Sequence, residues 1–408
     1  MKRNIYSLVL TIAACLMLNG AHAQCGSLYS DLLYSNVTVE TDTYSTVYGQ
    51  AMDIYQPVGD NSTARPLFIM AHGGSFYEGD KSEGDIVALC TVFAMRGYVC
   101  ASINYRLTSE ANLADSALLI GAVFQAVSDA KAAVRYFTKD AATTNKFRID
   151  PNVVVIGGTS AGAVLAVQYA YLNGANLSAN HVAPYIVAAI DSNGGIEGNS
   201  GNAGYPDSVI AVMSLAGGIN NPAWIVPGEP AMVMCQGTAD SVVPYGCNEI
   251  YRVPGLDSYQ LIRLCGSGAM QPVLEEAGIK NALLPFPGDG HVPWATDDTL
   301  LIQLDTFVAN FLAPIVCTQM LATGISDLNP TAALSVYPNP ASTVVTVKGG
   351  TGIQSLKLLD QLGRTVWADD KVNALQTEVP VGVLAPGIYY LLATFSNSEQ
   401  VVRKIVKQ

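Results

Sequence analysis

Residues 153–164, with the sequence VVVIGGTSAGAV, constrain the fold more than any other stretch of the chain. The four β-branched apolar residues at its start are typical of a buried parallel strand. A Gly-x-Ser-x-Gly motif follows at residues 158–162 and leads into small and apolar residues that favour a helix. A serine on such a strand-to-helix turn has a strained backbone and an exposed hydroxyl, and the glycines let strand and helix approach closely. The stretch predicts a nucleophile, Ser160, although a glycine-rich turn with an incidental serine would match the same motif.

Strand and helix patterns alternate between residues 52 and 312. Apolar runs that we interpret as strands cover residues 52–55, 66–71, 98–103, 153–156, 185–190, 231–235 and 282–286. Helical patterns cover residues 84–95, 116–139 and 299–312. Residues 196–230 are rich in Gly, Asn and Pro, so we expect loops and short helices there. The alternation predicts an α/β fold with a doubly wound, mostly parallel sheet.

The general base for the serine can be found by elimination, because the chain has only four histidines. His22 lies in the N-terminal leader, His72 in a His-Gly-Gly loop and His181 in a polar connection. Only His291 follows a predicted strand end and lies C-terminal to a candidate acid. A serine hydroxyl becomes a good nucleophile when a base takes its proton, and we assign that role to His291.

The base must in turn be oriented by an acid, for which Asp240 is our candidate. Asp240 directly follows the predicted strand 231–235, which places it at the carboxyl edge of the sheet with the serine. Asp191 and Asp289 compete for the role. Asp289 is too close in sequence to His291 to reach the far nitrogen of its ring easily.

An acyl transfer also needs hydrogen-bond donors for the oxyanion of its tetrahedral intermediate. The segment His72-Gly73-Gly74-Ser75 follows the predicted strand 66–71, at the place where lipases and esterases have a His-Gly-Gly-Gly loop. We predict the backbone N–H groups of Gly74, Ser75 and Ala161 as donors, although the loop alone could be a tight turn. This chemistry implies no cofactor and no metal, and the cysteine spacing does not suggest zinc.

Residues from about 53 to 312 resemble the α/β-hydrolase fold. Within it they are similar to carboxylesterases related to hormone-sensitive lipase and to bacterial feruloyl and acetyl-xylan esterases. The resemblance rests on the order Ser160…Asp240…His291 and on residues 72–74, 79–81, 104–107, 129–136, 158–163, 237–240 and 288–291. Two positions depart from the pattern, because Ser75 replaces the third loop glycine and Thr159 stands where the family often has an acid.

The resemblance implies a serine carboxylic-ester hydrolase that acts through an acyl-enzyme on a small or polysaccharide-linked ester. Two other functions are compatible with the same residues. One is an amidase, for instance of the formamidase type, or a peptidase. The other is a catalytically silent surface binding protein.

The pattern changes after residue 331. Short alternating runs at residues 334–337, 344–347, 355–359, 365–368, 387–394 and 401–406 predict a small all-β sandwich. The segments LSVYPNPA at 334–341, LLDQLGR at 358–364 and LAPGIYY at 384–390 resemble the C-terminal sorting domain of the Bacteroidetes type IX secretion system. That resemblance implies the type IX machinery as a partner. A carbohydrate-binding sandwich is the alternative. Such a domain would need exposed aromatic side chains that stack on sugar rings, and Trp367 is the only tryptophan after residue 331.

The N-terminus predicts export through the periplasm to the medium or the cell surface. Lys2 and Arg3 precede an apolar run, residues 5–18, and Ala21 and Ala23 provide small side chains at the cleavage positions. The run is short for a membrane span of ~20 residues, and we expect no span later in the chain. Cys25 would fit a lipoprotein, but the preceding Gln24 argues against one. We therefore expect a signal peptide (1–23), a catalytic domain (24–316), a linker (317–331) and a sorting domain (332–408).

Charge and cysteine content bear on the partners and on the redox state. The net charge of −12, without a basic patch, makes nucleic acid an unexpected partner. Of eight cysteines, Cys15 leaves with the signal, and an odd remainder in an oxidising compartment predicts disulfides plus a free thiol. Helix and strand rises bring Cys90 and Cys100 level with each other, within possible disulfide reach. We predict the pairs Cys90–Cys100, Cys247–Cys265 and Cys25–Cys317, with Cys235 free.

Overall fold

The structure is a computed structural model that describes residues 25, 27–174, 177, 182–250, 262–322, 334–361, 363–396 and 400–408. The export signal expected at residues 1–23, its cleavage site and His181 lie outside these residues. Residues 323–331 of the expected linker also lie outside them.

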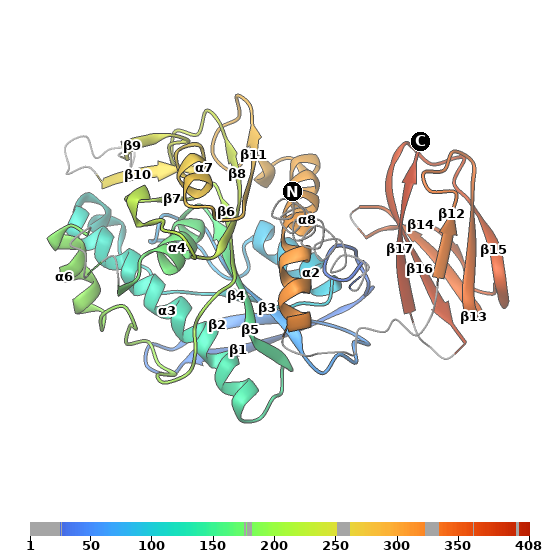
Figure 1. The fold of residues 1–408 in the computed structure, drawn as a ribbon, viewed down its shortest axis with the longest axis horizontal. Coiled ribbons are helices and arrows are strands. Elements are labelled where there is room, and N and C mark those ends of the chain that lie inside the picture. The colour runs from blue at the N-terminus through green and yellow to red at the C-terminus, as the bar shows by residue number, and fades with distance from the viewer. Residues whose placement is uncertain are drawn as a thin grey trace, which may run out of the picture.

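A central sheet of eight strands organises the first domain (Figure 1). The strands are β1 (Val37–Ser45), β2 (Gln50–Pro57), β3 (Arg65–Ala71), β4 (Val99–Ile103), β5 (Ile149–Thr159), β6 (Ala211–Leu215), β8 (Ala231–Gly237) and β11 (Asn281–Phe286). Their order across the sheet is β1-β2-β4-β3-β5-β6-β8-β11. From β4 to β11 all neighbours are parallel, while β2 is antiparallel to both of its neighbours. The prediction of a doubly wound, mostly parallel sheet is confirmed.

Helices pack on both faces of this sheet. They are α2 (Gly84–Met95), α3 (Ser116–Ala142), α4 (Ala161–Tyr171), α6 (Pro184–Ser192), α7 (Ser267–Glu276) and α8 (Asp298–Ala322). In β5, Val153 and Val155 belong to the core cluster that contains residues of α2 and α8. Val154 and Ile156 belong to the cluster formed with α3 and α4. Successive side chains of a strand point to opposite faces, so a strand buried on both sides reads as a continuous apolar run.

Two expectations for the middle of the chain were wrong. Residues 185–190, expected as a strand, lie in helix α6, which has Pro184 in its first turn. A short apolar run does not distinguish the two states, but Ile186 and Ile190 are four residues apart and both buried, as on one helix face. The loop region 196–230 contains β6, which lies between β5 and β8 in the centre of the sheet. Its Gly-, Asn- and Pro-rich flanks concealed that strand.

A second, three-stranded sheet lies outside the central one. It consists of β7 (Gly218–Ile219), β10 (Ile262–Gly266) and β9 (Cys247–Ile250), in that order. The sequence patterns did not predict these strands or helix α7. The strands are short, and two of the three have no more than four residues.

The C-terminal domain is an antiparallel β-sheet domain of six strands. They are β12 (Leu334–Tyr337), β13 (Val344–Leu359), β14 (Thr365–Asp369), β15 (Ala374–Pro380), β16 (Gly387–Phe395) and β17 (Gln400–Lys407). The long β13 pairs with β12 and β15 in its first part and with β14 and β16 in its last part. The N–H of Ala341 donates to the carbonyl of Val406, so the sheet is nearly closed into a barrel. The expected small all-β domain is confirmed, although its β15 was missed.

Two of the three expected disulfides are present, Cys25–Cys317 and Cys247–Cys265. The expected Cys90–Cys100 bridge was wrong, because both thiols are free and buried, as is that of Cys235. The rises per residue of the helix and the strand place Cys90 and Cys100 at the same height along the strand direction. They do not determine the distance between the helix and the sheet. Packed layers lie about 10 Å apart, beyond the ~7 Å Cα separation that a disulfide tolerates.

Helix α8 runs to Ala322 and therefore through the first residues of the expected linker. By length and composition alone, α8 and α3 could also cross a membrane, contrary to our expectation for the later runs. In the most apolar 18-residue segment of each helix, 67% of the α3 segment and 39% of the α8 segment are buried within the fold. Helix α3 contributes residues to one of the two cores that flank the sheet, and α8 contributes residues to the other.

Candidate active site

Ser160 lies on the turn between β5 and α4. Its backbone has φ 53° and ψ −118°, a region that non-glycine residues rarely occupy and that is common at functional sites. Its N–H donates to the carbonyl of Leu215 at 2.8 Å, which fixes the turn to β6. A Cβ at Gly158 would lie 2.4 Å from the carbonyl O of Ala71, and one at Gly162 would lie 2.1 Å from the same atom. Both glycines of the motif are thus required by the close approach of β3.

The structure brings the three predicted site residues into one hydrogen-bonded chain. His291 Nε2 lies 2.8 Å from Ser160 Oγ, and His291 Nδ1 lies 2.8 Å from Asp240 Oδ2. The Asp240 side chain is completely buried, whereas that of His291 is 20% exposed. Of the competing acids, Asp289 lies in the loop before His291 and Asp191 is exposed on α6. The arrangement therefore joins the serine, the ring and one carboxylate in the order that proton transfer from the serine needs.

The carboxylate of Asp240 is held by its own loop. Its Oδ1 accepts the N–H groups of Val242 at 2.9 Å and Val243 at 3.0 Å. Gln236, the fully buried penultimate residue of β8, donates from Nε2 to the Val243 carbonyl at 2.8 Å and to Asp240 Oδ2 at 3.3 Å. Its Oε1 accepts the N–H of Ser267 at 2.8 Å. Gln236 was not among the predicted site residues, because its only signal in the sequence is a polar side chain at the end of an apolar strand.

The loop after β3 carries two of the predicted oxyanion donors. Gly74 has φ 101° and Ser75 has φ 50°. A Cβ at Gly74 would lie 2.1 Å from the carbonyl O of Glu78, so only glycine fits there. A Cβ at Gly73 would lie 3.5 Å from the Cβ of Ser160, which places this loop against Ser160. Ala161, the third predicted donor, is the first residue of α4 and directly follows the serine.

His72 supports this loop from inside the protein. Its ring is fully buried and stacks on that of Tyr105, with centroids 4.3 Å apart and an interplanar angle of 13°. The Tyr105 hydroxyl lies 2.9 Å from the His72 carbonyl O and 3.1 Å from the Gly73 carbonyl O, and donates to both. Burial lowers the pKa of His72, which keeps the ring neutral. His72 therefore packs beneath the loop, and His291 is the histidine that contacts Ser160.

A cavity of about 170 Å³ opens beside Ser160. Ser75, Ser160 and Ala161 are among the residues that line it, so a molecule bound in the cavity would lie beside the Ser160 hydroxyl. Most of the other lining residues are apolar: Phe76, Leu113, Leu119, Ile120, Val123, Phe124, Val164, Ile186, Trp224, Val242, Val243, Ile262 and Leu264. Such a cavity favours an apolar acyl or alcohol group. Among the residues that the structure describes, no group of three His, Cys, Asp or Glu side chains could hold a metal ion.

Two family models match the chain. Residues 52–199 match the model described as BD-FAE, and residues 335–408 match the secretion system C-terminal sorting domain. The chain therefore carries a BD-FAE domain followed by a secretion sorting domain. The BD-FAE match includes Ser160 and the loop with Gly74 and ends before Asp240 and His291, whose assignment rests on the geometry above.

The chain is also similar in fold to solved structures. The apo form of Thermogutta terrifontis esterase 2 has a TM-score of 0.50 and 20% sequence identity, over 70% of this chain and 95% of that one. The same esterase phosphoramylated by tabun gives the same four values. At this identity the likeness shows a common fold, and the predicted α/β class with a mostly parallel sheet agrees with it. No curated protein sequence matches the chain.

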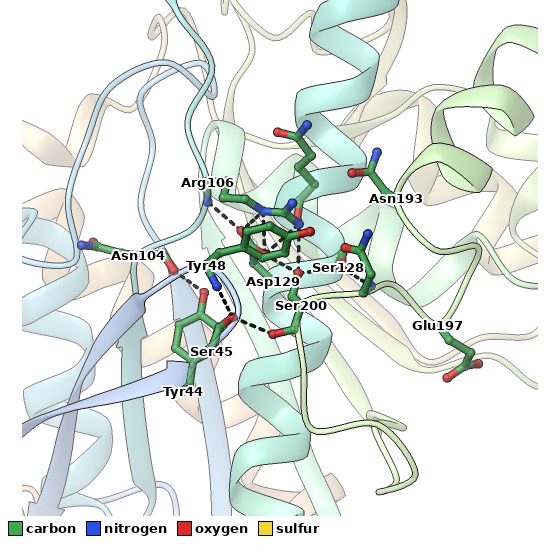
Figure 2. A network of polar contacts seen from close by, with 12 residues as sticks. Tyr44, Ser45, Tyr48, Asn104, Arg106, Ser128, Asp129, Asn193, Glu197 and Ser200 are labelled. Carbon is green, nitrogen blue, oxygen red and sulfur yellow. Dashed lines mark hydrogen bonds and ion pairs between the residues drawn. The ribbon is translucent and has the colours of Figure 1, made fainter.

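A buried polar network fixes the loop that carries Tyr105 in the BD-FAE domain (Figure 2). Asp129 of α3 is fully buried, and Arg106 donates to it from the backbone N–H at 2.7 Å and from Nε at 2.9 Å. The Arg106 guanidinium also stacks over the ring of Tyr48, 3.9 Å from its centroid, and donates to Ser200 Oγ at 2.9 Å. Because Tyr105 precedes Arg106, the network helps to hold the Tyr105 hydroxyl against the carbonyl groups of His72 and Gly73.

Removal of the buried carboxylate in this network is expected to destabilise the domain strongly. Asp129→Ala leaves Arg106 without its charge partner, and such a loss costs about 3–5 kcal/mol in the free energy of unfolding. The measurement is denaturant unfolding followed by tryptophan fluorescence. The control is Asp191→Ala, which removes an exposed carboxylate on α6 and should change stability by less than about 0.5 kcal/mol. Equal stabilities for the two variants would show that the network contributes nothing.

Proposed function

We propose that the chain is a secreted serine carboxylesterase with Ser160 as nucleophile, His291 as general base and acid, and Asp240 as the acid that orients His291. The observation that carries the proposal is the pair of 2.8 Å contacts that link the three side chains at a strained strand-to-helix turn. The esterase-like fold and the cavity beside Ser160 also support it. Nothing in the proposed mechanism needs a cofactor or a metal.

The reaction begins when His291 Nε2 takes the proton of Ser160 Oγ, and the oxygen attacks the ester carbonyl. The N–H groups of Gly74, Ser75 and Ala161 then stabilise the oxyanion of the tetrahedral intermediate. His291 returns the proton to the departing alcohol, which leaves an acyl group on the serine. Water attacks this acyl-enzyme, again with His291 as base, and releases the acid product.

Asp240 stays ionised throughout this cycle. It accepts the Nδ1–H of His291, which fixes the ring tautomer and stabilises the imidazolium as it forms. The N–H groups of Val242 and Val243 hold the carboxylate in place, so the ring keeps its orientation when the serine is acylated.

The test of the proposed function is the hydrolysis of a substrate panel by the purified protein. Aryl esters, acetylated xylan, methyl ferulate and aryl amides with matched acyl groups distinguish the candidates. We expect turnover of esters with kcat/KM above that of the matched amides. Faster amide hydrolysis would favour an amidase or a peptidase, and the absence of any turnover would favour a silent binding protein.

The sorting domain carries the proposal for location. We propose that the type IX secretion machinery recognises residues 335–408 and delivers the protein to the medium or the cell surface. The intact mass of the protein from the native host's culture supernatant is expected to correspond to a chain without the segment after about residue 329. A secreted protein that still ends at Gln408 would contradict this maturation.

A further inference from the structure

The wall of the apolar cavity beside Ser160 includes a buried residue with an acceptor for which the described residues supply no partner. Gln168 lines the cavity and is only 4% exposed. Its Nε2 lies 3.5 Å from the carbonyl O of Gly218, at the outer limit for a hydrogen bond. Its Oε1 has no hydrogen-bond partner within the described part of the chain. A buried, unpaired carbonyl in apolar surroundings is costly, so such groups usually have a hydrogen-bond partner, which can be an ordered water or a ligand group.

The other polar residues of the cavity wall are already engaged. Ser75 and Ser160 belong to the reaction centre proposed above. Asn220 donates from Nδ2 to the carbonyl of Arg263 at 3.0 Å, and Ser116 has an interaction partner as well. Gln168 is therefore the polar residue of this wall whose side chain still has an unpaired acceptor among the described residues.

Helix α4 places Gln168 at a defined depth in the cavity. Ala161, Val164 and Gln168 are spaced by three and four residues, so they lie on one face of the helix, and all three line the cavity. Gln168 follows Ser160 by eight residues, a rise of about 12 Å along the helix axis. The span fits a short to medium chain extending from the ester carbon.

We propose that Gln168 Oε1 accepts a hydrogen bond from a hydroxyl or N–H group at the far end of an otherwise apolar acyl or alcohol chain. The preferred substrate is then an ester whose buried group is apolar along its length and carries a donor at its tip. The kinetic test of this inference rests on the proposed esterase function of Ser160. Binding of a ligand to Gln168 does not require turnover and can be measured without it.

The kinetic test compares esters that differ only at the tip of the chain. One arm uses aryl esters of butanoic, hexanoic and octanoic acids, each with and without a terminal hydroxyl. A second arm uses acetates of the corresponding alkanols and alkanediols. The wild-type protein should prefer a hydroxyl-terminated chain by about tenfold in kcat/KM, the size expected when a buried acceptor gains its donor. The arm that shows the preference identifies which side of the ester fills the cavity.

Gln168→Leu removes the acceptor at similar side-chain volume, and this preference should disappear or reverse. Val164→Ala is the matched control, because it changes the same cavity wall on the same helix without removing a polar group. It should keep the preference. Gln168→Met serves as a second acceptor-free variant if the leucine variant fails to fold.

Binding to the Ser160→Ala protein, measured by calorimetry, separates this inference from the proposed function. Hydroxyl-terminated acids or alcohols should bind about tenfold more tightly than the plain ones, and Gln168→Leu in this background should abolish the difference. Absence of turnover together with this discrimination would refute the esterase and retain the subsite. Equal binding of both ligand types, or an equal loss for both in Gln168→Leu, would overturn the role of Gln168.

Discussion

Ser160→Ala is expected to lower kcat for aryl ester hydrolysis by about 10⁶-fold, because no other group in the mechanism can form the acyl-enzyme. The free energy of unfolding should change by less than about 1 kcal/mol, since only one hydroxyl and its contact with His291 are lost. The measurement is the initial rate on an activated aryl ester at saturating concentration, together with the thermal midpoint of the variant.

A matched control is Ser192→Ala, which removes a serine hydroxyl at the exposed end of α6 and should leave kcat unchanged. Ser160→Ala activity near that of the wild type would place the nucleophile elsewhere in the chain. A large fall in the thermal midpoint would mean that the rate loss reflects unfolding and not chemistry.

Asp240→Asn is expected to lower kcat by about 10⁴-fold with little change in KM. The amide cannot accept the Nδ1–H of His291 in the tautomer that leaves Nε2 free to take the serine proton. The effect is smaller than that of Ser160→Ala because the acid orients the base and does not itself transfer the proton. Steady-state kinetics on the same aryl ester provide both constants.

The matched control for the acid is Asp289→Asn. Asp289 lies two residues before His291, whereas the structure places the carboxylate of Asp240 2.8 Å from its ring. Asp289→Asn should therefore stay within about tenfold of the wild-type kcat, well short of the loss expected for a residue of the triad. If the two variants exchange behaviour, Asp240 is only a turn residue and the acid must be reassigned.

The elements that the sequence predicted well are those with a local cause. The turn at Ser160 needs two glycines at fixed spacing, and that requirement is visible in five residues. His291 and Asp240 were predicted because parallel strands bring their carboxyl ends to one edge of a sheet. The geometry of the three side chains agrees with those candidates, and their catalytic roles stay predictions.

The errors concern features that depend on neighbours distant in sequence. Strand β6 and helix α6 are defined by what packs against them, and a short apolar run carries no period that separates the two states. Cys90 and Cys100 lie at similar heights along the strand direction, which favoured a disulfide. The distance between the helix layer and the sheet, which the sequence does not give, keeps the two thiols apart. Gln168 also went unnoticed, because an unpaired acceptor becomes visible only when its surroundings are known.

Covalent labelling tests the central claim most directly. The protein is treated with a fluorophosphonate probe, digested, and the labelled peptide is sequenced by mass spectrometry. We predict one adduct on Ser160, absent in Ser160→Ala and formed far more slowly in His291→Ala, because the ring activates the serine oxygen. A protein that hydrolyses esters but shows no adduct, or an adduct on a different residue, would contradict the proposed mechanism.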